Sequence, residues 1–318
     1  MRVMRRREFL LAGAAAATVL RGATMTRKER VDRALAGETV DRTPFTFWHH
    51  FGLKTPEEHA ARTLEFHRDY RTDLVKVMSD FPYPKAKGKN WYDLKLVDNP
   101  FPQQIKALEL IRDGLNGDAY FVETVFNSWN VAEKLSSKED VRKLQHDNPQ
   151  ALLNALDMIT QSQIKHIRKA LKTGAAGILL SVANANEAEM KREDYIKYSL
   201  PFDRRLMKAA ADSKLAILHL HLEKDFIALY EDFPATAINF STHVSHVPIR
   251  EMRRRYSQMI MGGIDEVNYR KLSERELKAQ WDAAQGAAGK KFMLTPGCSV
   301  PNDSTPEELK RLPAIVGA

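Results

Sequence analysis

The chain contains only one cysteine, Cys298, among 318 residues, so no internal disulfide can form. It has no low-complexity tract and no repeat of fixed period, which excludes a solenoid. The apolar run Leu10–Leu20 is too short to cross a bilayer, so we expect no membrane span. Half of the formal charge of +8 comes from residues 1–24, and no basic helix with interleaved aromatics follows. The composition therefore argues against a nucleic-acid partner.

The first 24 residues have the features of an export signal. Arg6–Leu10 resembles the twin-arginine motif, and the apolar run of small residues behind it is followed by Arg21. We expect residues 1–24 to direct twin-arginine export to the periplasm and residues 25–318 to form the folded protein. If translation starts at Met25 instead, the protein would be cytoplasmic. Twin-arginine export carries folded proteins, which suits an enzyme that takes up a metal before it leaves the cytoplasm.

Short apolar segments recur along residues 25–318, separated by amphipathic stretches. Eight of them have the pattern of buried strands: Pro44–His50, Asp73–Met78, Ala119–Val125, Gly177–Val182, Leu215–Leu222, Thr236–Phe240, Gln258–Ile264 and Phe292–Thr295. Helical patterns lie between them, including Thr55–Tyr70 and Lys138–Lys172 with a break near Pro149, and Phe81–Pro102 is a long irregular stretch. This alternation predicts an α/β protein with a single (β/α)8 TIM barrel and no second domain.

The segment Leu215–Leu222 carries two histidines two positions apart. In a strand, residues i and i+2 point to the same face, so His219 and His221 should project together. Cys298 follows another short strand and a Pro-Gly turn. Two imidazoles and one thiolate would make a zinc site with one open position, so we expect these three residues to bind zinc. The alternative is a pair of hydrogen-bonded core histidines.

Polar residues at other strand ends could complete a site, because TIM barrels place their chemistry at the carboxyl ends of the strands. Asp80 and Asp265 are the candidate acid–base residues, although each could simply cap the following helix. Glu223 is a candidate fourth metal ligand. We expect substrate contacts from four further strand-end residues: His49, His50, Asn127 and Asn184.

Several motifs between Met25 and the C-terminus resemble the uroporphyrinogen decarboxylase superfamily. They are Arg27–Gly37, Asp41–Pro44, Gly174–Leu180, Ile217–His219, Met261–Asp265, Thr295–Cys298 and Thr305–Glu307. Together these motifs are fairly specific for the superfamily, but they do not specify one activity.

The superfamily has two branches with different chemistry. True uroporphyrinogen decarboxylases need no metal and bind substrate carboxylates with arginines after the first strand, whereas the equivalent stretch here, Trp48–Gly52, has no arginine. The other branch contains zinc methyltransferases that act with corrinoid proteins or thiol acceptors and hold zinc with His-x-Cys and a later cysteine. This chain matches that pattern at His219 and Cys298, with His221 in place of the middle cysteine. It therefore resembles the methyltransferase branch more closely.

The resemblance implies zinc-dependent methyl transfer to or from a small molecule, with a corrinoid or tetrapyrrole as substrate or partner and with a corrinoid protein as a candidate partner. One thiolate instead of two would leave a bound zinc more Lewis acidic, which favours activation of an oxygen ligand over thiol-methyl transfer. Three alternatives stay open: porphyrinogen decarboxylation, a non-catalytic exported barrel that binds a corrinoid or tetrapyrrole, and a metal-dependent hydrolase.

Overall fold

The structure is a computed structural model, and it describes residues 24–221 and 226–318. The elements follow in the order α1 (Arg27–Ala36), α2 (Pro56–Tyr70), β1 (Leu74–Val77), α3 (Pro102–Leu115), β2 (Tyr120–Phe126), α4 (Ser128–Leu135), α5 (Lys138–Asp147), α6 (Pro149–Lys172), β3 (Gly177–Val182), α7 (Arg192–Tyr198), α8 (Leu200–Lys208), β4 (Leu215–Leu220), η1 (Ile227–Tyr230), β5 (Ala237–Phe240), α9 (Ile249–Arg255), β6 (Met259–Ile264), η2 (Tyr269–Lys271), α10 (Glu274–Ala288), β7 (Phe292–Pro296) and α11 (Pro306–Val316). The expected export signal, up to residue 23, and Glu223 lie outside the described residues. Within the described residues, no helix is both long and apolar enough to cross a membrane.

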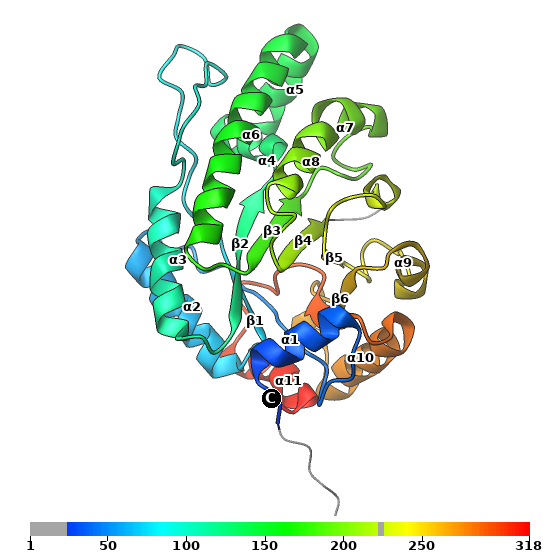
Figure 1. Cartoon of the computed structure of the whole chain (residues 1–318). Coiled ribbons are helices and arrows are strands. Elements are labelled where there is room, and N and C mark those ends of the chain that lie inside the picture. The colour runs from blue at the N-terminus through cyan, green and yellow to red at the C-terminus, as the bar shows by residue number, and fades with distance from the viewer. Residues whose placement is uncertain (1–23, 222–225) are drawn as a thin grey trace, which may run out of the picture.

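Seven parallel strands form one curled sheet in the order β1 to β7, with helices packed around it (Figure 1). Neighbouring strands are in register, so Ser181 of β3 lies beside His219 of β4, which lies beside Asn239 of β5. Because all the strands run in the same direction, their carboxyl ends meet on one side of the sheet. This is an α/β fold consistent with a TIM-like barrel.

The first predicted strand, Pro44–His50, is the one part of the eight-strand prediction that the structure corrects. Only an isolated bridge between Phe45 and Leu294 remains of it. The segment still lies between the two edge strands: the Thr46 amide donates to the Leu294 carbonyl, and the Asp73 amide donates to the Phe45 carbonyl. On the β1 side, side chains replace the ladder, because the Asp73 carboxylate accepts from the Phe45 amide and the Thr46 hydroxyl donates to the Leu74 carbonyl. A regular strand therefore does not form there.

The inside of the sheet is filled by apolar side chains from successive strands. Leu74, Val122, Leu179 and Ile217 belong to one buried cluster with side chains of β5 to β7. Val31 and Ala34 of α1 belong to the same cluster, so this helix covers the amino ends of the strands. Close packing at that end leaves the carboxyl ends as the face where polar side chains can gather.

An ion-pair network ties α1 to the start of β1. Arg30 donates to Asp41 and to Asp73 at 2.7 Å each, and Arg42 donates to Asp73 at 2.6 Å. The hydrogen bond from Arg30 lowers the pKa of Asp41 to about 2. Removing one partner would leave buried charge uncompensated, so the network holds this segment in one position.

The predicted interruption of the long helical region is confirmed, because α5 ends at Asp147 and α6 begins at Pro149.

Two helices, α3 and α4, were absent from the sequence-based prediction. The α4 helix has only eight residues, and the Asn127 side chain caps it by accepting from the Asn130 amide at 3.1 Å. Helices this short depend on tertiary packing more than on their own propensity, which explains why the pattern did not reveal it.

Candidate metal centre at the barrel mouth

The predicted cluster of two histidines and one cysteine exists in the structure. His219 and His221 leave the carboxyl end of β4 with their ring centroids 4.2 Å apart. Cys298 lies just beyond β7, and its Sγ is 4.0 Å from His221 Nε2. Each of the three residues offers one ligand atom, and these three atoms all lie within 4.8 Å of one another. A tetrahedral zinc site with bonds of about 2.0–2.3 Å needs ligand atoms somewhat closer together, so small side-chain movements would suffice.

The turn that carries Cys298 depends on glycine at position 297. A Cβ atom there would lie 2.2 Å from the Ser241 Cα, which no side chain can tolerate. Beneath the turn, the buried Glu266 carboxylate accepts from the Gly297 amide at 3.1 Å. Burial raises the pKa of Glu266 above its usual range. These contacts bring the Cys298 backbone close to β5 and hold it there.

Asn239 of β5 determines which nitrogen of His219 is free. Its Nδ2 donates to the Met261 carbonyl at 3.1 Å, the Thr295 hydroxyl at 2.9 Å and the Pro296 carbonyl at 3.1 Å. The amide is therefore oriented with Oδ1 toward His219 Nδ1, which must donate to it. His219 Nε2 then keeps its lone pair for a metal. Such a hydrogen bond behind a ligand histidine is a common feature of zinc sites, and its single asparagine is hard to find from sequence alone.

The protonation states also fit metal binding. Burial, with the neighbouring His221, lowers the pKa of His219 to about 4, and burial together with the Lys76 charge lowers that of His221 to about 4. Burial alone would raise the pKa of the Cys298 thiol, but interaction with His219 outweighs it and the pKa falls below its usual range. Neutral imidazoles and an acidified thiol are the forms that bind zinc. The residues present therefore fit this metal.

Lys76 is a site residue that the sequence analysis missed. It occupies β1 between Val75 and Val77, and its Nζ lies 5.4 Å from the centre of the Trp48 ring. Burial lowers its pKa to about 8, and the charges of Cys298 and Asp80 act on it. A lysine within an otherwise apolar strand was the available signal, because buried lysines are rare unless they are paired or functional.

Asp80, a predicted acid–base residue, lies at the mouth, and His59 Nε2 is 3.5 Å from its Oδ2. Asp265 is placed differently: it binds the amides of Val267 and Asn268 at 3.0 Å each, which is a turn-forming role. The adjacent Glu266, which was not predicted, is the acidic residue that reaches the Cys298 turn. An acid–base role for Asp80 or Asp265 stays a prediction.

The four predicted substrate-contact residues fall into two groups. His49 Nε2 is bonded to the Asn302 carbonyl at 2.7 Å, and the His50 amide donates to the Asn302 side chain at 3.3 Å. Asn127 and Asn184 are buried and bonded to each other at 2.8 Å. Both asparagines also contact Ser199, so the structure gives them a packing role, while substrate contact by any of the four residues stays a prediction.

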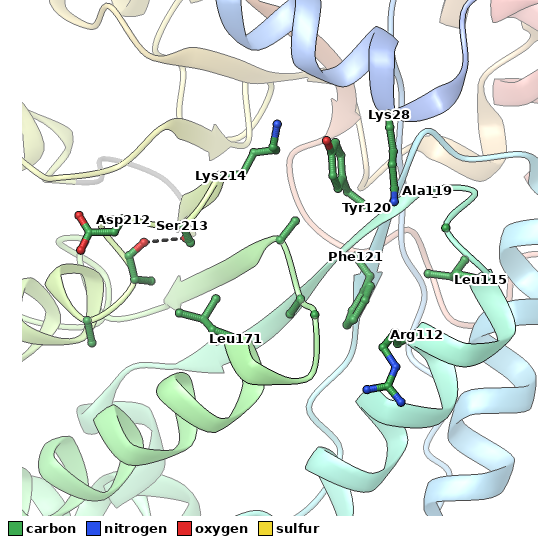
Figure 2. A pocket seen from close by; sticks show the side chains of 16 residues that line it. Lys28, Arg112, Leu115, Ala119, Tyr120, Phe121, Leu171, Asp212, Ser213 and Lys214 are labelled. Atoms are coloured by element: carbon green, nitrogen blue, oxygen red, sulfur yellow. Dashed lines mark hydrogen bonds between the residues drawn. The ribbon is translucent and has the colours of Figure 1, made fainter.

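A different hollow lies at the amino ends of β2 to β4, with a volume of about 540 Å³ (Figure 2). Figure 2 shows Lys28 reaching it from α1 and Arg112 from α3. One of its lysines is paired: Lys214 binds Asp32 at 2.6 Å, and the Tyr120 hydroxyl donates to the same carboxylate at 3.0 Å. TIM-like barrels carry their chemistry at the opposite end, so this hollow is not the candidate reaction site.

The fold and the site together define a class: an α/β barrel-like protein with a candidate His-His-Cys metal centre at the carboxyl ends of its strands. A family model described as Uroporphyrinogen decarboxylase (URO-D) matches residues 76–318. The chain therefore belongs to the uroporphyrinogen decarboxylase family, which confirms the resemblance seen in the sequence.

Curated relatives match part of the chain. Uroporphyrinogen decarboxylases from Pseudomonas entomophila (strain L48) and Pseudomonas aeruginosa (strain LESB58) are 24% identical to it over 232 and 233 residues. Each match covers 58% of this chain and 65% of the relative, so it spans less than two thirds of those proteins.

Solved structures share the fold over most of the chain. A methyltransferase from Methanosarcina mazei superposes with a TM-score of 0.75 at 18% identity, covering 92% of this chain and 98% of that one. A B12-independent methionine synthase from Shewanella sp. W3-18-1, in complex with selenomethionine, has a TM-score of 0.60 at 10% identity, covering 86% and 91%. At such identities the likeness shows the fold and not the activity.

Proposed function

We propose that this protein is a zinc-dependent methyltransferase of the uroporphyrinogen decarboxylase family. The observation that supports the proposal is that His219, His221 and Cys298 come together at the barrel mouth. Each offers one ligand atom, and the three atoms lie within 4.8 Å of one another. Zinc held by these residues would supply a Lewis-acidic open position for the heteroatom that gains or loses the methyl group. With one thiolate among three ligands, the site favours oxygen over sulfur at that position.

The chain's own residues would prepare the site in three ways. Asn239 orients His219 so that its Nε2 faces the cluster. Lys76 places a positive charge near Cys298, which favours an anionic leaving group or nucleophile. Asp80 is a carboxylate at the mouth that could take or return a proton, since its buried Oδ2 has no hydrogen-bond partner among the described residues and His59 Nε2 lies 3.5 Å away.

Uroporphyrinogen decarboxylation is the second candidate, because the curated relatives carry that name. Against it, Trp48–Gly52 has no arginine, and the described residues lining the mouth cavity beside Asp80 include none. A substrate with eight carboxylates would need several such partners. A corrinoid protein or free corrinoid is the partner we propose for methyl transfer.

Metal analysis of the untagged protein tests the proposal directly. We expect about one zinc per chain, and methyl transfer from methylcobalamin to a small-molecule acceptor, or its reverse. Protein without zinc that converts uroporphyrinogen would establish the second candidate instead. Zinc with bound corrinoid but no turnover would favour a carrier, and zinc-dependent ester or amide hydrolysis would favour a hydrolase.

We also propose twin-arginine export directed by residues 1–24. A reporter fused after Ala23 should reach the periplasm, and lysine at both Arg6 and Arg7 should keep it in the cytoplasm. A reporter that stays cytoplasmic with both arginines intact would favour translation from Met25.

A further inference from the structure

A cavity of about 240 Å³ lies at the carboxyl ends of β1 and β2. Its wall includes Phe126, which pairs in register with Ser181 of β3. The Ser181 hydroxyl lies 3.4 Å from His221 Nε2. Strand β3 therefore lies between the cavity wall on β2 and the metal-binding histidines that follow β4. A ligand in it could present a reacting atom to them.

The walls of this cavity are largely aromatic. Phe81, Tyr83, Phe101 and Phe126 all line it. In another protein, a cavity of about 150 Å³ holds a benzene ring, so this one has room for a ring with a small substituent. Apolar walls with a few polar groups are typical of small-molecule sites, and these walls favour a flat, apolar ligand body.

The polar groups around the cavity carry an excess of positive charge. Lys85 and Lys134 line it, and Lys134 of α4 lies over the Phe126 ring at 3.1 Å. Within the described residues, no carboxylate comes within 4 Å of either ammonium group, and Asp80 is the one acidic residue that lines the cavity. The Lys134 side chain is exposed to solvent, yet the protein around it lowers its pKa to about 8 by desolvation. Both observations fit a side chain that lines a concave site. Two ammonium groups facing one carboxylate leave an anion-binding position open.

His166 adds a hydrogen-bonding atom. Its Nε2 is held by the buried Glu123 carboxylate at 2.9 Å, and its ring lines the cavity. Its Nδ1 is buried and has no partner among the described residues. A buried ring nitrogen without a partner costs free energy, and a polar ligand group that reached it from the cavity would remove that cost.

We propose that this cavity binds a small aromatic carboxylate, with the ring between the aromatic walls and the carboxylate against Lys134. The assignment of this ligand as the methyl donor or acceptor rests on the proposed methyl transfer, whereas the binding itself does not. Neither the metal centre nor the family assignment requires an anionic ring-bearing ligand at this position.

Calorimetric titration of the full-length protein with three probes tests the proposal. Benzoate has both the ring and the charge, benzamide keeps the ring without the charge, and acetate keeps the charge without the ring. We expect benzoate to bind at least about tenfold more tightly than either of the others. Equal affinity for benzoate and benzamide would overturn the proposal.

Variants locate the binding. Lys134→Met should lower benzoate affinity about tenfold, to the level of benzamide, and Lys134→Arg should restore most of it. Lys214→Met is the matched control, because Lys214 also lies over an aromatic ring, Tyr120, but in the hollow at the other end of the strands. An unchanged benzoate affinity in a folded Lys134→Met protein would contradict the proposal, and the unfolding midpoint of each variant verifies folding.

Cys298→Ser separates this inference from the proposed function. If benzoate occupies the cavity, its affinity should stay within about threefold when the metal site is damaged. Loss of benzoate binding together with the metal would show that the carboxylate binds the metal, and this inference would fail. A wild-type protein that binds benzoate but contains no zinc would instead refute the proposed methyl transfer and leave the cavity assignment intact.

Discussion

The two ends of the strands both carry lysines beside aromatic rings, but they use the charge differently. At the amino ends, Lys214 lies over Tyr120 and binds Asp32, so its charge is neutralised within the hollow. At the carboxyl ends, Lys76 lies over Trp48, and Lys134 lies over Phe126, without a carboxylate this close. The larger of the two hollows is thus the one in which Lys214 already has a carboxylate partner. The candidate reaction site is distinguished by lysines next to the metal-binding residues and Asp80, and not by its volume.

The largest effect should come from the metal-binding residues themselves. His219→Ala, His221→Ala or Cys298→Ser should each weaken zinc binding by about 10³-fold, since each removes one of three ligands. Competition with a chromogenic chelator measures the affinity. His146→Ala is the control, because this exposed histidine lies far along the chain on α5 and pairs with Asp147. If the control loses zinc equally, the metal is not held at the mouth.

A pH titration of the metal-free protein should show the buried histidines of the mouth. Both His219 and His221 have a pKa of about 4 in the folded protein and near 6.5 when unfolded. The unfolded chain therefore takes up protons first, so stability is fully present above pH 6.5 and is lost as the pH falls toward 4. The loss should be at most about 3 kcal/mol per histidine.

Chemical denaturation at several pH values measures this loss. The double variant His219→Ala/His221→Ala should have a shallower slope between pH 6.5 and 4 than the wild type. Identical slopes would mean that the two imidazoles are not held neutral by burial. Other buried histidines, such as His59 and His67, are common to both proteins and cancel in the comparison.

Replacing the residue behind His219 should have an intermediate effect. Asn239→Ala leaves His219 free to turn and to change tautomer, and outer hydrogen-bond partners of metal ligands are typically worth about 10–100-fold in affinity. Zinc affinity should fall within that range while the metal still binds. A matched change at an exposed asparagine, Asn268→Ala, should leave it unaltered, since that side chain donates to the Asp265 carboxylate within a surface turn. An affinity equal to wild type in Asn239→Ala would show that the tautomer is set in another way.

The smallest effect should come from the paired lysine at the amino ends. Lys214→Met removes a partly exposed ion pair, which contributes about 0–1 kcal/mol to stability. Zinc content should not change, because the substitution is at the opposite end of the strands. A marked loss of zinc in this variant would remove the contrast between the two hollows. Urea denaturation and metal analysis of the same sample give both readouts.

The sequence alone contained the local part of this structure. Short, continuous apolar runs placed seven strands correctly, and helical periodicity with Pro149 located the division between α5 and α6. The spacing of His219 and His221 placed both rings on one side of β4, and the Pro-Gly turn indicated where Cys298 could reach them. These features depend on residues close together along the chain, which is why a pattern can reveal them.

Tertiary structure decided which distant side chains meet. Only the β4–β5 register brings Asn239 beside His219, and only the packing of the turn against Ser241 requires glycine at 297. The Pro44–His50 segment had a strand pattern, yet the Asp73 and Thr46 side chains take the hydrogen bonds that a ladder would have used. Lys76 was not predicted as a site residue, because only the curled sheet brings it near Cys298 and Asp80. Such contacts join residues far apart in sequence, so they depend on strand register and barrel curvature, which no local pattern encodes.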